Sequence, residues 1–221
     1  MSFEYSNLPV RPSGPVLRVL SHVLPGVRRT HGEVVPYARA WERANAAAAR
    51  AQGPLWVVLG DSMAQGIGAS SYRRGWPGQL AERLAGGHRM VNLSAYGART
   101  VDVLERQWPA ALALGPIALV TCVIGSNDVV WGRHRAALPA AFARLVDTLP
   151  AGSLVSNLPN PVRAAREVDE LLRTRGAARG LRVADMRAAR ISWRGKLAPD
   201  HFHPNDAGYA AMADVLAAAL A

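Results

Sequence analysis

Cysteine, lysine and long hydrophobic runs are all scarce in this sequence of 221 residues. Cys122 is the only cysteine, so the chain cannot form an internal disulfide, and a zinc site built from cysteine ligands is excluded. It lies in an apolar run, where we expect a small buried side chain. No uninterrupted run of about 18 apolar residues occurs, and the first residues lack the basic and apolar segments of a signal peptide. We therefore expect a soluble, cytoplasmic protein.

The excess of positive charge is almost entirely arginine, because Lys196 is the only lysine. The formal net charge is +10 at pH 7. A dedicated nucleic-acid binder concentrates its basic residues on one element and mixes them with aromatic side chains. Here the arginines are spread from Arg11 to Arg194. We therefore do not expect nucleic acid as a partner, and a basic module that binds it stays only as an alternative of another class.

Hydrophobic residues make up 50% of the chain, which is enough for one ordinary globular domain. Residues 1–52 differ from the rest, since they hold no strand-like run and carry seven arginines against three glutamates. They predict a helical N-terminal extension, with helices over residues 15–24 and 36–51 and with Pro25-Gly26 ending the first. These helices either pack on the domain of residues 53–221 or form a basic amphipathic surface in peripheral contact with anionic lipid.

From residue 54 onward, short apolar runs alternate with stretches of helical pattern. Continuous apolar strands separated by helices are typical of a parallel sheet covered on both faces. The sequence therefore predicts an α/β fold with three α/β/α layers and a five-stranded parallel sheet of flavodoxin-like type. The expected strands span residues 55–59, 90–93, 117–124, 154–156 and 181–184. The expected helices span residues 75–86, 99–113, 134–149, 162–178 and 206–220.

Polar loops follow the expected strands, at the edge where open parallel sheets bind ligands. Ser62 comes directly after the first strand, and Asp200 and His203 lie just before the last helix. A hydroxyl nucleophile needs a base within hydrogen-bond reach, and the base needs a carboxylate that orients it. A three-residue spacing lets Asp200 meet Nδ1 of His203 and leaves Nε2 for the serine. We therefore expect Ser62, His203 and Asp200 to act as nucleophile, base and orienting acid.

Donors for a developing oxyanion are present in the same loops. The backbone N–H groups of Ser62 and Gly97 and the side-chain amide of Asn127 are the candidates. A glycine at position 97 lets the chain approach a substrate without a side chain in the way. These three residues form the expected oxyanion hole.

Four blocks of residues occur in order, each on an expected loop. They are Gly60-Asp-Ser62, Asn92-Leu-Ser-Ala-Tyr-Gly97, Gly125-Ser-Asn-Asp128 and Asp200-His-Phe-His203. In these blocks the sequence resembles the SGNH (GDSL-type) hydrolase superfamily, over about residues 54–221. It departs from the common pattern at Met63 and Ala64, which affects substrate contacts more than the chemistry.

The resemblance implies a serine hydrolase that needs no metal and no cofactor. It would cleave carboxylic (acyl) esters through an acyl-enzyme, as esterases and lysophospholipases do, and its partner would be a small-molecule acyl ester. The same fold leaves open an acyltransferase and a carbohydrate or lipid deacylase. The acceptor and the physiological substrate do not follow from the kinship.

Several motif residues also have structural interpretations. Ser62 alternatively caps a following helix, since serine is a favoured N-cap. His201 competes with His203, although only His203 has the three-residue spacing from the acid. We interpret Asp61 as a structural acceptor beside the nucleophile and Asp128 as a residue that orders its loop.

Aromatic and basic residues flank these loops. Trp76, Trp131 and Tyr96 either line an acyl or aryl pocket or belong to the core. Arg99 and Arg133 follow the second and third loops, where they either meet an anionic substrate group or lie by chance in an arginine-rich chain.

Overall fold

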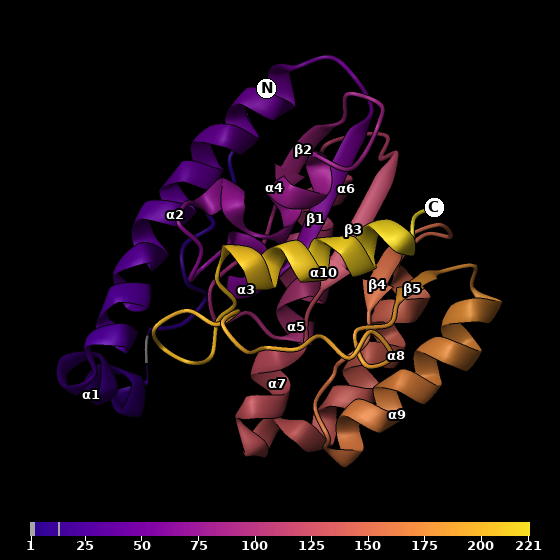
Figure 1. The fold of residues 1–221 in the computed structure, drawn as a ribbon. Helices are drawn as coiled ribbons and strands as arrows, with labels where there is room; N and C mark the ends of the chain where they lie inside the picture. The colour runs from indigo at the N-terminus through magenta and orange to yellow at the C-terminus, as the bar shows by residue number, and fades with distance from the viewer. Residues whose placement is uncertain (1–2, 13) are drawn as a thin grey trace.

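The computed structural model describes residues 3–12 and 14–221, and the side chains of residues 15–18 lie outside that description. Its centre is one sheet of five parallel strands in the order β2-β1-β3-β4-β5, with helices on both faces (Figure 1). The predicted three-layer fold and the flavodoxin-like strand order are confirmed. The strands are β1 (Leu55–Gly60), β2 (Arg89–Asn92), β3 (Leu119–Val123), β4 (Leu154–Ser156) and β5 (Arg182–Ala184).

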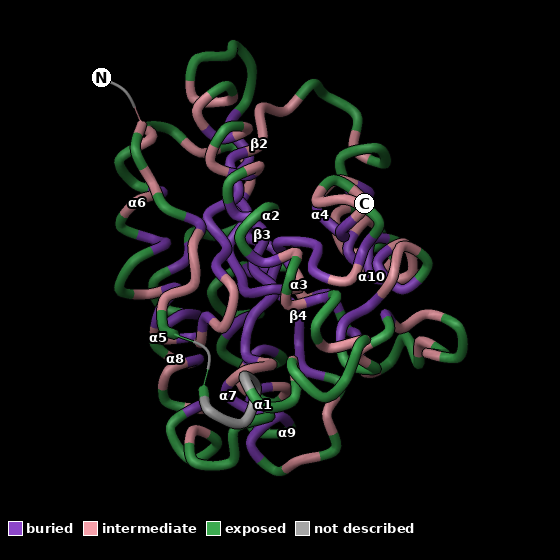
Figure 2. The backbone as a smooth tube through the Cα atoms, turned by 90° about the vertical axis from the view of Figure 1, so that its left-hand side faces the viewer, coloured by how far each residue is buried: buried purple, intermediate pink, exposed green. Residues whose placement is uncertain are grey.

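Every residue of β1 is buried, and its side chains alternate between two apolar cores. Leu55, Val57 and Leu59 join the core beneath α6 (Trp108–Leu112), α8 (Leu138–Thr148) and α9 (Arg163–Leu171). Trp56 and Val58 join the core beneath α4 (Trp76–Ala81) and α10 (Asp206–Ala218), which pack against each other. Figure 2 shows the buried residues gathered along the strands and the exposed ones on the outer helices and loops.

The helices differ from the predicted ones mainly at their ends. The stretch predicted at residues 99–113 begins as α5 (Thr100–Asp102) and contains a π-helical turn at Val103–Gln107 before α6. The stretch predicted at 162–178 ends in a second π-helical turn, Leu172–Gly176, and that predicted at 134–149 begins as the 3-10 helix Gly132–Ala137. Three short helices were not predicted, because each is shorter than two turns and carries little periodicity: α3 (Ser62–Gln65), α7 (Ser126–Val130) and the 3-10 turn Tyr72–Arg74.

The second N-terminal helix begins eleven residues earlier than predicted. Helix α1 (Pro15–Val23) is followed at once by α2 (Pro25–Arg50), so Pro25 opens a helix as well as ending one. Pro36 lies inside α2, although an interior proline removes one backbone hydrogen bond. The burial of Val34, Ala38 and Trp41 along one face of α2 offsets that loss.

Three buried asparagines attach the N-terminal segment to the outer edge of the sheet. The side-chain amides of Asn7 and Asn45 donate to the carbonyl of Asn92 at 2.9 and 2.7 Å, and Asn45 Oδ1 accepts from the Asn92 N–H at 2.8 Å. Asn92 belongs to β2, an edge strand whose backbone would otherwise lack partners on one side. Helix α2 thus packs on the domain of residues 53–221, which is one of the two alternatives given for the N-terminal helices.

Within residues 3–12 and 14–221, no helix is long and apolar enough to cross a lipid bilayer.

Candidate active site

The loops after β1 and β3 meet at the edge of the sheet toward which the strands run. A Cβ on Gly60, the last residue of β1, would lie 2.6 Å from the carbonyl oxygen of Val123, so only glycine allows this approach. Asp61 then caps α3, because its side chain accepts from the N–H of Met63 at 3.0 Å. Ser62 is the first helical residue and not the cap, so the capping interpretation of Ser62 is wrong.

Ser62, His203 and Asp200 come together in one hydrogen-bonded chain. With the ring proton on Nδ1, His203 donates to Asp200 Oδ2 at 2.6 Å and accepts from the Ser62 hydroxyl at Nε2 over 2.9 Å. Both Ser62 and His203 are buried, with 3% and 5% of their surface exposed, so bulk water competes little for these bonds. His201 is exposed and takes no part in this chain.

The loop before α10 fixes the carboxylate of Asp200 from two sides. Its Oδ1 accepts from the backbone N–H groups of Phe202 and His203, both at 3.0 Å, while Oδ2 accepts from the His203 ring. Burial alone would raise the pKa of Asp200, but these hydrogen bonds and the nearby imidazole outweigh burial and hold the pKa at about 2. Asp200 is therefore ionised at neutral pH and can stabilise an imidazolium.

Gly97 and Asn127 lie on neighbouring loops that are tied together. The Asn127 side-chain amide donates to the Ala98 carbonyl at 3.0 Å, directly after Gly97, and makes a long contact of 3.4 Å with Asp61 Oδ2. Gly97 has a φ of +73°, which favours glycine, and a Cβ there would meet nothing within 4 Å. The loop backbone at Gly97 therefore borders open space.

Asp61 and Asp128 have the structural roles expected of them. The carboxylate of Asp61 accepts from Ser126 Oγ as well as from Met63, and burial raises the pKa of Asp61 to about 6. Asp128 Oδ2 accepts from the backbone N–H and the hydroxyl of Thr100, at 3.0 and 3.1 Å. These bonds tie together the loops after the first three strands.

The part of the chain that carries these loops matches a known family. The family model of GDSL-like lipases and acylhydrolases matches residues 58–211. The chain belongs to this family. Comparison with curated proteins returns no match.

Solved structures of SGNH and GDSL hydrolases share the fold of this GDSL-family chain at low sequence identity. A proposed SGNH hydrolase from Slackia heliotrinireducens is 20% identical, covers 77% of this chain and 100% of its own, and superposes with a TM-score of 0.58. The family 3 carbohydrate esterase of Clostridium thermocellum is 15% identical over 73% of this chain and 92% of its own, with a TM-score of 0.55. A lipolytic protein of the G-D-S-L family from Veillonella parvula is 18% identical over 73% and 94%, with a TM-score of 0.56.

Gln107 is a buried residue of the site that the sequence did not reveal. Its side-chain amide donates to the carbonyl of Gly60 at 2.8 Å and accepts from the Gly60 N–H at 2.9 Å. The amide thus holds the end of β1, two residues before the GDSL-family serine. Gln107 ends the π-helical turn, and because a π turn carries an extra residue, the regular helical pattern gave no sign of where this side chain points.

An apolar cavity of about 320 Å³ lies beside the hydrogen-bonded chain of Ser62, His203 and Asp200. Met63 and Phe202, the neighbours of Ser62 and His203, line it. Its lining also includes Leu158, Met186, Trp193 and Met212. The cavity therefore has the chemistry of an acyl pocket, although neither Trp193 nor Phe202 was expected in it.

The aromatic residues singled out in the sequence have three different positions. Trp76 is fully buried in the core, while Trp131 is 42% exposed at the end of α7. Tyr96 lies beside the site, with its ring centroid 6.3 Å from that of His203. Of the three, only Tyr96 is in ring contact with His203.

Arg99 and Arg133 converge on His134. Arg99 Nη1 lies 3.0 Å from His134 Nδ1, and Arg133 Nε lies 3.1 Å from His134 Nε2. Burial and the two arginines lower the pKa of His134, so this imidazole is neutral at pH 7 and the local charge is that of the guanidinium groups. An anionic substrate group near Arg99 and Arg133 stays a prediction.

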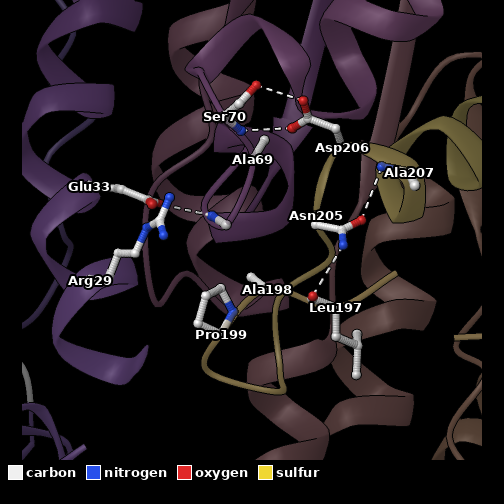
Figure 3. A pocket seen from close by; sticks show the side chains of 11 residues that line it. Arg29, Glu33, Ala69, Ser70, Leu197, Ala198, Pro199, Asn205, Asp206 and Ala207 are labelled. Carbon is white, nitrogen blue, oxygen red and sulfur yellow. Dashed lines mark hydrogen bonds between the residues drawn. The ribbon is translucent and has the colours of Figure 1, made fainter. Parts of the chain in front are cut away.

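A second cavity, of about 510 Å³, borders the loop that carries Asp200 from the side of α2 (Figure 3). In this view Glu33 reaches across from α2, and its carboxylate accepts from the N–H of Gly68 at 2.7 Å. On the far side Ser70 donates to Asp206 through both its N–H and its hydroxyl. These bonds hold α2 and α10 against the loop that follows α3.

Among residues 3–12 and 14–221, no group of three or more His, Cys, Asp and Glu side chains is placed to bind a metal ion.

Proposed function

We propose that the chain hydrolyses carboxylic esters through an acyl-enzyme formed on Ser62. The observation that carries the proposal is the chain of hydrogen bonds from the Ser62 hydroxyl through His203 to the ionised Asp200. This is the arrangement that serine hydrolases of unrelated folds share. Membership of the GDSL-like lipase/acylhydrolase family supports it.

In the first half-reaction the Ser62 Oγ attacks the acyl carbon while His203 Nε2 takes the hydroxyl proton. The developing oxyanion accepts hydrogen bonds from the N–H groups of Ser62 and Gly97 and from Asn127. The Asn127 amide is held by its bond to Ala98, and its second hydrogen, engaged only in the long contact with Asp61, turns to the oxyanion. The C–O bond then breaks, and His203 gives its proton to the leaving alcohol.

In the second half-reaction His203 removes a proton from water, which attacks the acyl-enzyme. The tetrahedral intermediate uses the same three donors. Its collapse breaks the bond to Ser62 Oγ, which recovers a proton from His203, and the carboxylic acid leaves. Asp200 stabilises the imidazolium in both halves and stays ionised, in keeping with its low pKa.

The apolar cavity favours an acyl chain longer than acetyl as the substrate's acid part. Each methylene that it buries contributes about 0.8 kcal/mol, or about a fourfold gain in kcat/KM. We expect kcat/KM for p-nitrophenyl esters to rise from acetate until the cavity is full. Trp193→Ala, which removes a wall of the cavity, should weaken this preference and leave acetate hydrolysis nearly unchanged. A preference for acetyl esters of sugars would instead indicate a carbohydrate deacylase.

The direct test labels the protein with a fluorophosphonate and locates the adduct by mass spectrometry. We expect the label on Ser62, and none after acid denaturation. Ser62→Ala should lower hydrolysis of p-nitrophenyl butyrate by at least about a thousandfold and keep the wild-type melting temperature within a few degrees. Ser126→Ala is the matched control, since its hydroxyl lies in the same region but bonds only to Asp61. Full activity of Ser62→Ala would exclude this mechanism.

Acyl transfer to a hydroxyl acceptor uses the same acyl-enzyme and is the second candidate. Ser62 and His203 are buried, which limits the access of water to the acyl-enzyme. This burial favours transfer of the acyl group to another acceptor. Product analysis with glycerol or a sugar present distinguishes the two, because a transferase forms a new ester where a hydrolase releases the free acid.

A further inference from the structure

Large apolar side chains are exposed mainly at one end of the molecule. Nine such side chains are exposed among the described residues, and seven of them belong to α1, to α7 or to the loop of His203. The other two are Val35, in the middle of α2, and Leu112, at the end of α6. We call the seven the apolar rim; they are Val19, Leu20, Val23, Leu24, Val130, Trp131 and Phe202.

Helix α1 contributes a continuous apolar strip to the rim. Val19 and Val23 are one turn apart, as are Leu20 and Leu24, so the four side chains share one face. Val19 is 62% and Val23 is 67% exposed, so this face is not packed on the part of the chain that the structure describes. An unpacked apolar face of this kind marks a binding surface more often than a core element.

The rim lies at the same end of the molecule as the proposed catalytic site. Helices α1 and α7 both lie at the end of the molecule toward which the strands run, and both views place them there (Figures 1 and 2). At the start of α2, a Cβ on Gly26 would lie 2.0 Å from the carbonyl oxygen of Pro199, next to Asp200. The ring of Phe202 lies 4.9 Å from that of His203. The apolar rim and the catalytic residues therefore share one face.

The charge around the rim is positive. Arg28 and Arg29, just after α1, and Arg133 and Arg135, just after Trp131, are all exposed. The carboxylates that lie near them point inward, since Glu33 bonds to Gly68, Asp128 to Thr100 and Asp200 to His203. Apolar side chains flanked by arginines fit the boundary between acyl chains and anionic headgroups.

We propose that the apolar rim docks this chain onto an anionic phospholipid surface, with the catalytic entrance facing the bilayer. The apolar side chains of α1, together with Val130, Trp131 and Phe202, enter the headgroup layer, and the four arginines lie against phosphate groups. Docking brings an ester in the outer leaflet to the entrance without the lipid first passing through water. The proposal goes beyond ester hydrolysis, because it assigns a partner surface that soluble esters do not need.

The test measures co-sedimentation of the full chain with vesicles of phosphatidylglycerol and of phosphatidylcholine. The double variant Val23→Asp/Trp131→Asp places a carboxylate in each half of the rim without touching the catalytic chain or the apolar cavity. We expect it to bind phosphatidylglycerol vesicles at least about tenfold more weakly than the wild type, because two apolar contacts are lost and two repulsive charges gained. Val35→Asp/Leu112→Asp, matched in exposure and charge, should bind as the wild type does.

Hydrolysis of p-nitrophenyl acetate by the rim variant should equal that of the wild type, which separates this proposal from the catalytic one. Equal vesicle binding by the wild type and the rim variant would overturn it, as would failure of the wild type to bind. Equal affinity for the two lipids would overturn the choice of an anionic surface. A dimer of the wild type that the rim variant loses, with no vesicle binding, would assign the rim to a second copy of the chain and also overturn the proposal.

Discussion

The four residues from Asp200 to His203 make one compact turn that holds both the imidazole and the carboxylate that orients it. The Asp200 carboxylate binds the turn's own N–H groups with one oxygen and the His203 ring with the other. The orientation of the ring is thus set by the turn itself and does not need a carboxylate from a distant loop. At the residue scale, the three-residue spacing between Asp200 and His203 was enough to predict the contact between the carboxylate and the imidazole.

The low pKa of Asp200 predicts a dependence of stability on pH. An ordinary aspartate has a pKa of about 3.9, and here the folded pKa is about 2, so the ionised carboxylate stabilises the fold. That contribution is complete above about pH 5 and is lost as the pH falls toward 2. We expect the difference in unfolding free energy between the wild type and Asp200→Asn to shrink as the pH falls from 5 toward 2, as measured by urea unfolding. A difference that does not change between pH 5 and 3 would contradict the assignment.

The side-chain amide of Asn127 predicts an effect on turnover. Removing one oxyanion donor costs about 3 kcal/mol of transition-state stabilisation, so Asn127→Ala should lower kcat about a hundredfold. KM should change little, because the donor acts on charge that develops only in the transition state. Steady-state kinetics with p-nitrophenyl butyrate measure both constants, and a loss confined to KM would show that Asn127 binds substrate and does not stabilise the oxyanion.

At the scale of elements, the ends of β1 and of the π-helical turn are coupled through Gln107. Its two bonds to Gly60 supplement the backbone bond that the Gly60 carbonyl accepts from Ala95. Ser62 follows two residues later. In the proposed mechanism Gln107 therefore positions the nucleophile without taking part in the chemistry.

Gln107→Leu should destabilise the fold by about 2 kcal/mol, because it removes the partner of the buried Gly60 N–H and leaves the Gly60 carbonyl with only the longer bond from the Ala95 N–H. It should also lower kcat more than it raises KM, since Ser62 loses its support while the apolar cavity stays intact. Arg106→Leu, an exposed change in the same π turn, is the control. It should leave the unfolding free energy and kcat nearly unchanged. Urea unfolding and ester kinetics on both variants test this, and equal stability of Gln107→Leu and the wild type would contradict it.

The sequence predicted the strands and the loops of the site well, because apolar runs and glycine-flanked polar residues are local signals. It predicted the start of α2 wrongly for two reasons. A proline that ends one helix can also begin the next, as Pro25 does. Pro36 is tolerated inside α2 because of tertiary packing, which has no local sequence pattern. Gln107 and the asparagines at β2 depend on contacts across 47 and more residues. Such pairs follow from the tertiary fold and have no signature within their own segments.

At the scale of the whole molecule, the described residues of the N-terminal segment contribute to the packed body of the protein. Trp41 is 1% exposed and donates to the carbonyl of Gln65 at 3.0 Å, three residues after Ser62. Asn7 and Asn45 protect the edge of β2. On α2, Val34 and Ala38 join Trp41 in the core, while its five arginines are exposed.

We therefore expect a chain of residues 53–221 alone to be strongly destabilised and prone to aggregate through the exposed edge of β2. Thermal unfolding followed by circular dichroism should show a transition at least about 10 °C lower than that of the full chain, or none at all. Asn45→Ala removes the hydrogen bonds of one side chain, so its melting temperature should lie between those of the full chain and of the 53–221 chain. A melting temperature of the 53–221 chain equal to that of the full chain would show the segment to be a separable appendage.

Ser62 and His203, the nucleophile and base of the proposed mechanism, are separated by 141 residues along the chain. During synthesis the ribosome therefore releases Ser62 long before it has made His203, and every shorter nascent chain carries the serine without this proton acceptor. In the proposed mechanism, ester hydrolysis requires that the loop of His203 be in place, followed by α10 packed against α4. The regain of ester hydrolysis during refolding would then report the docking of this last segment of the chain.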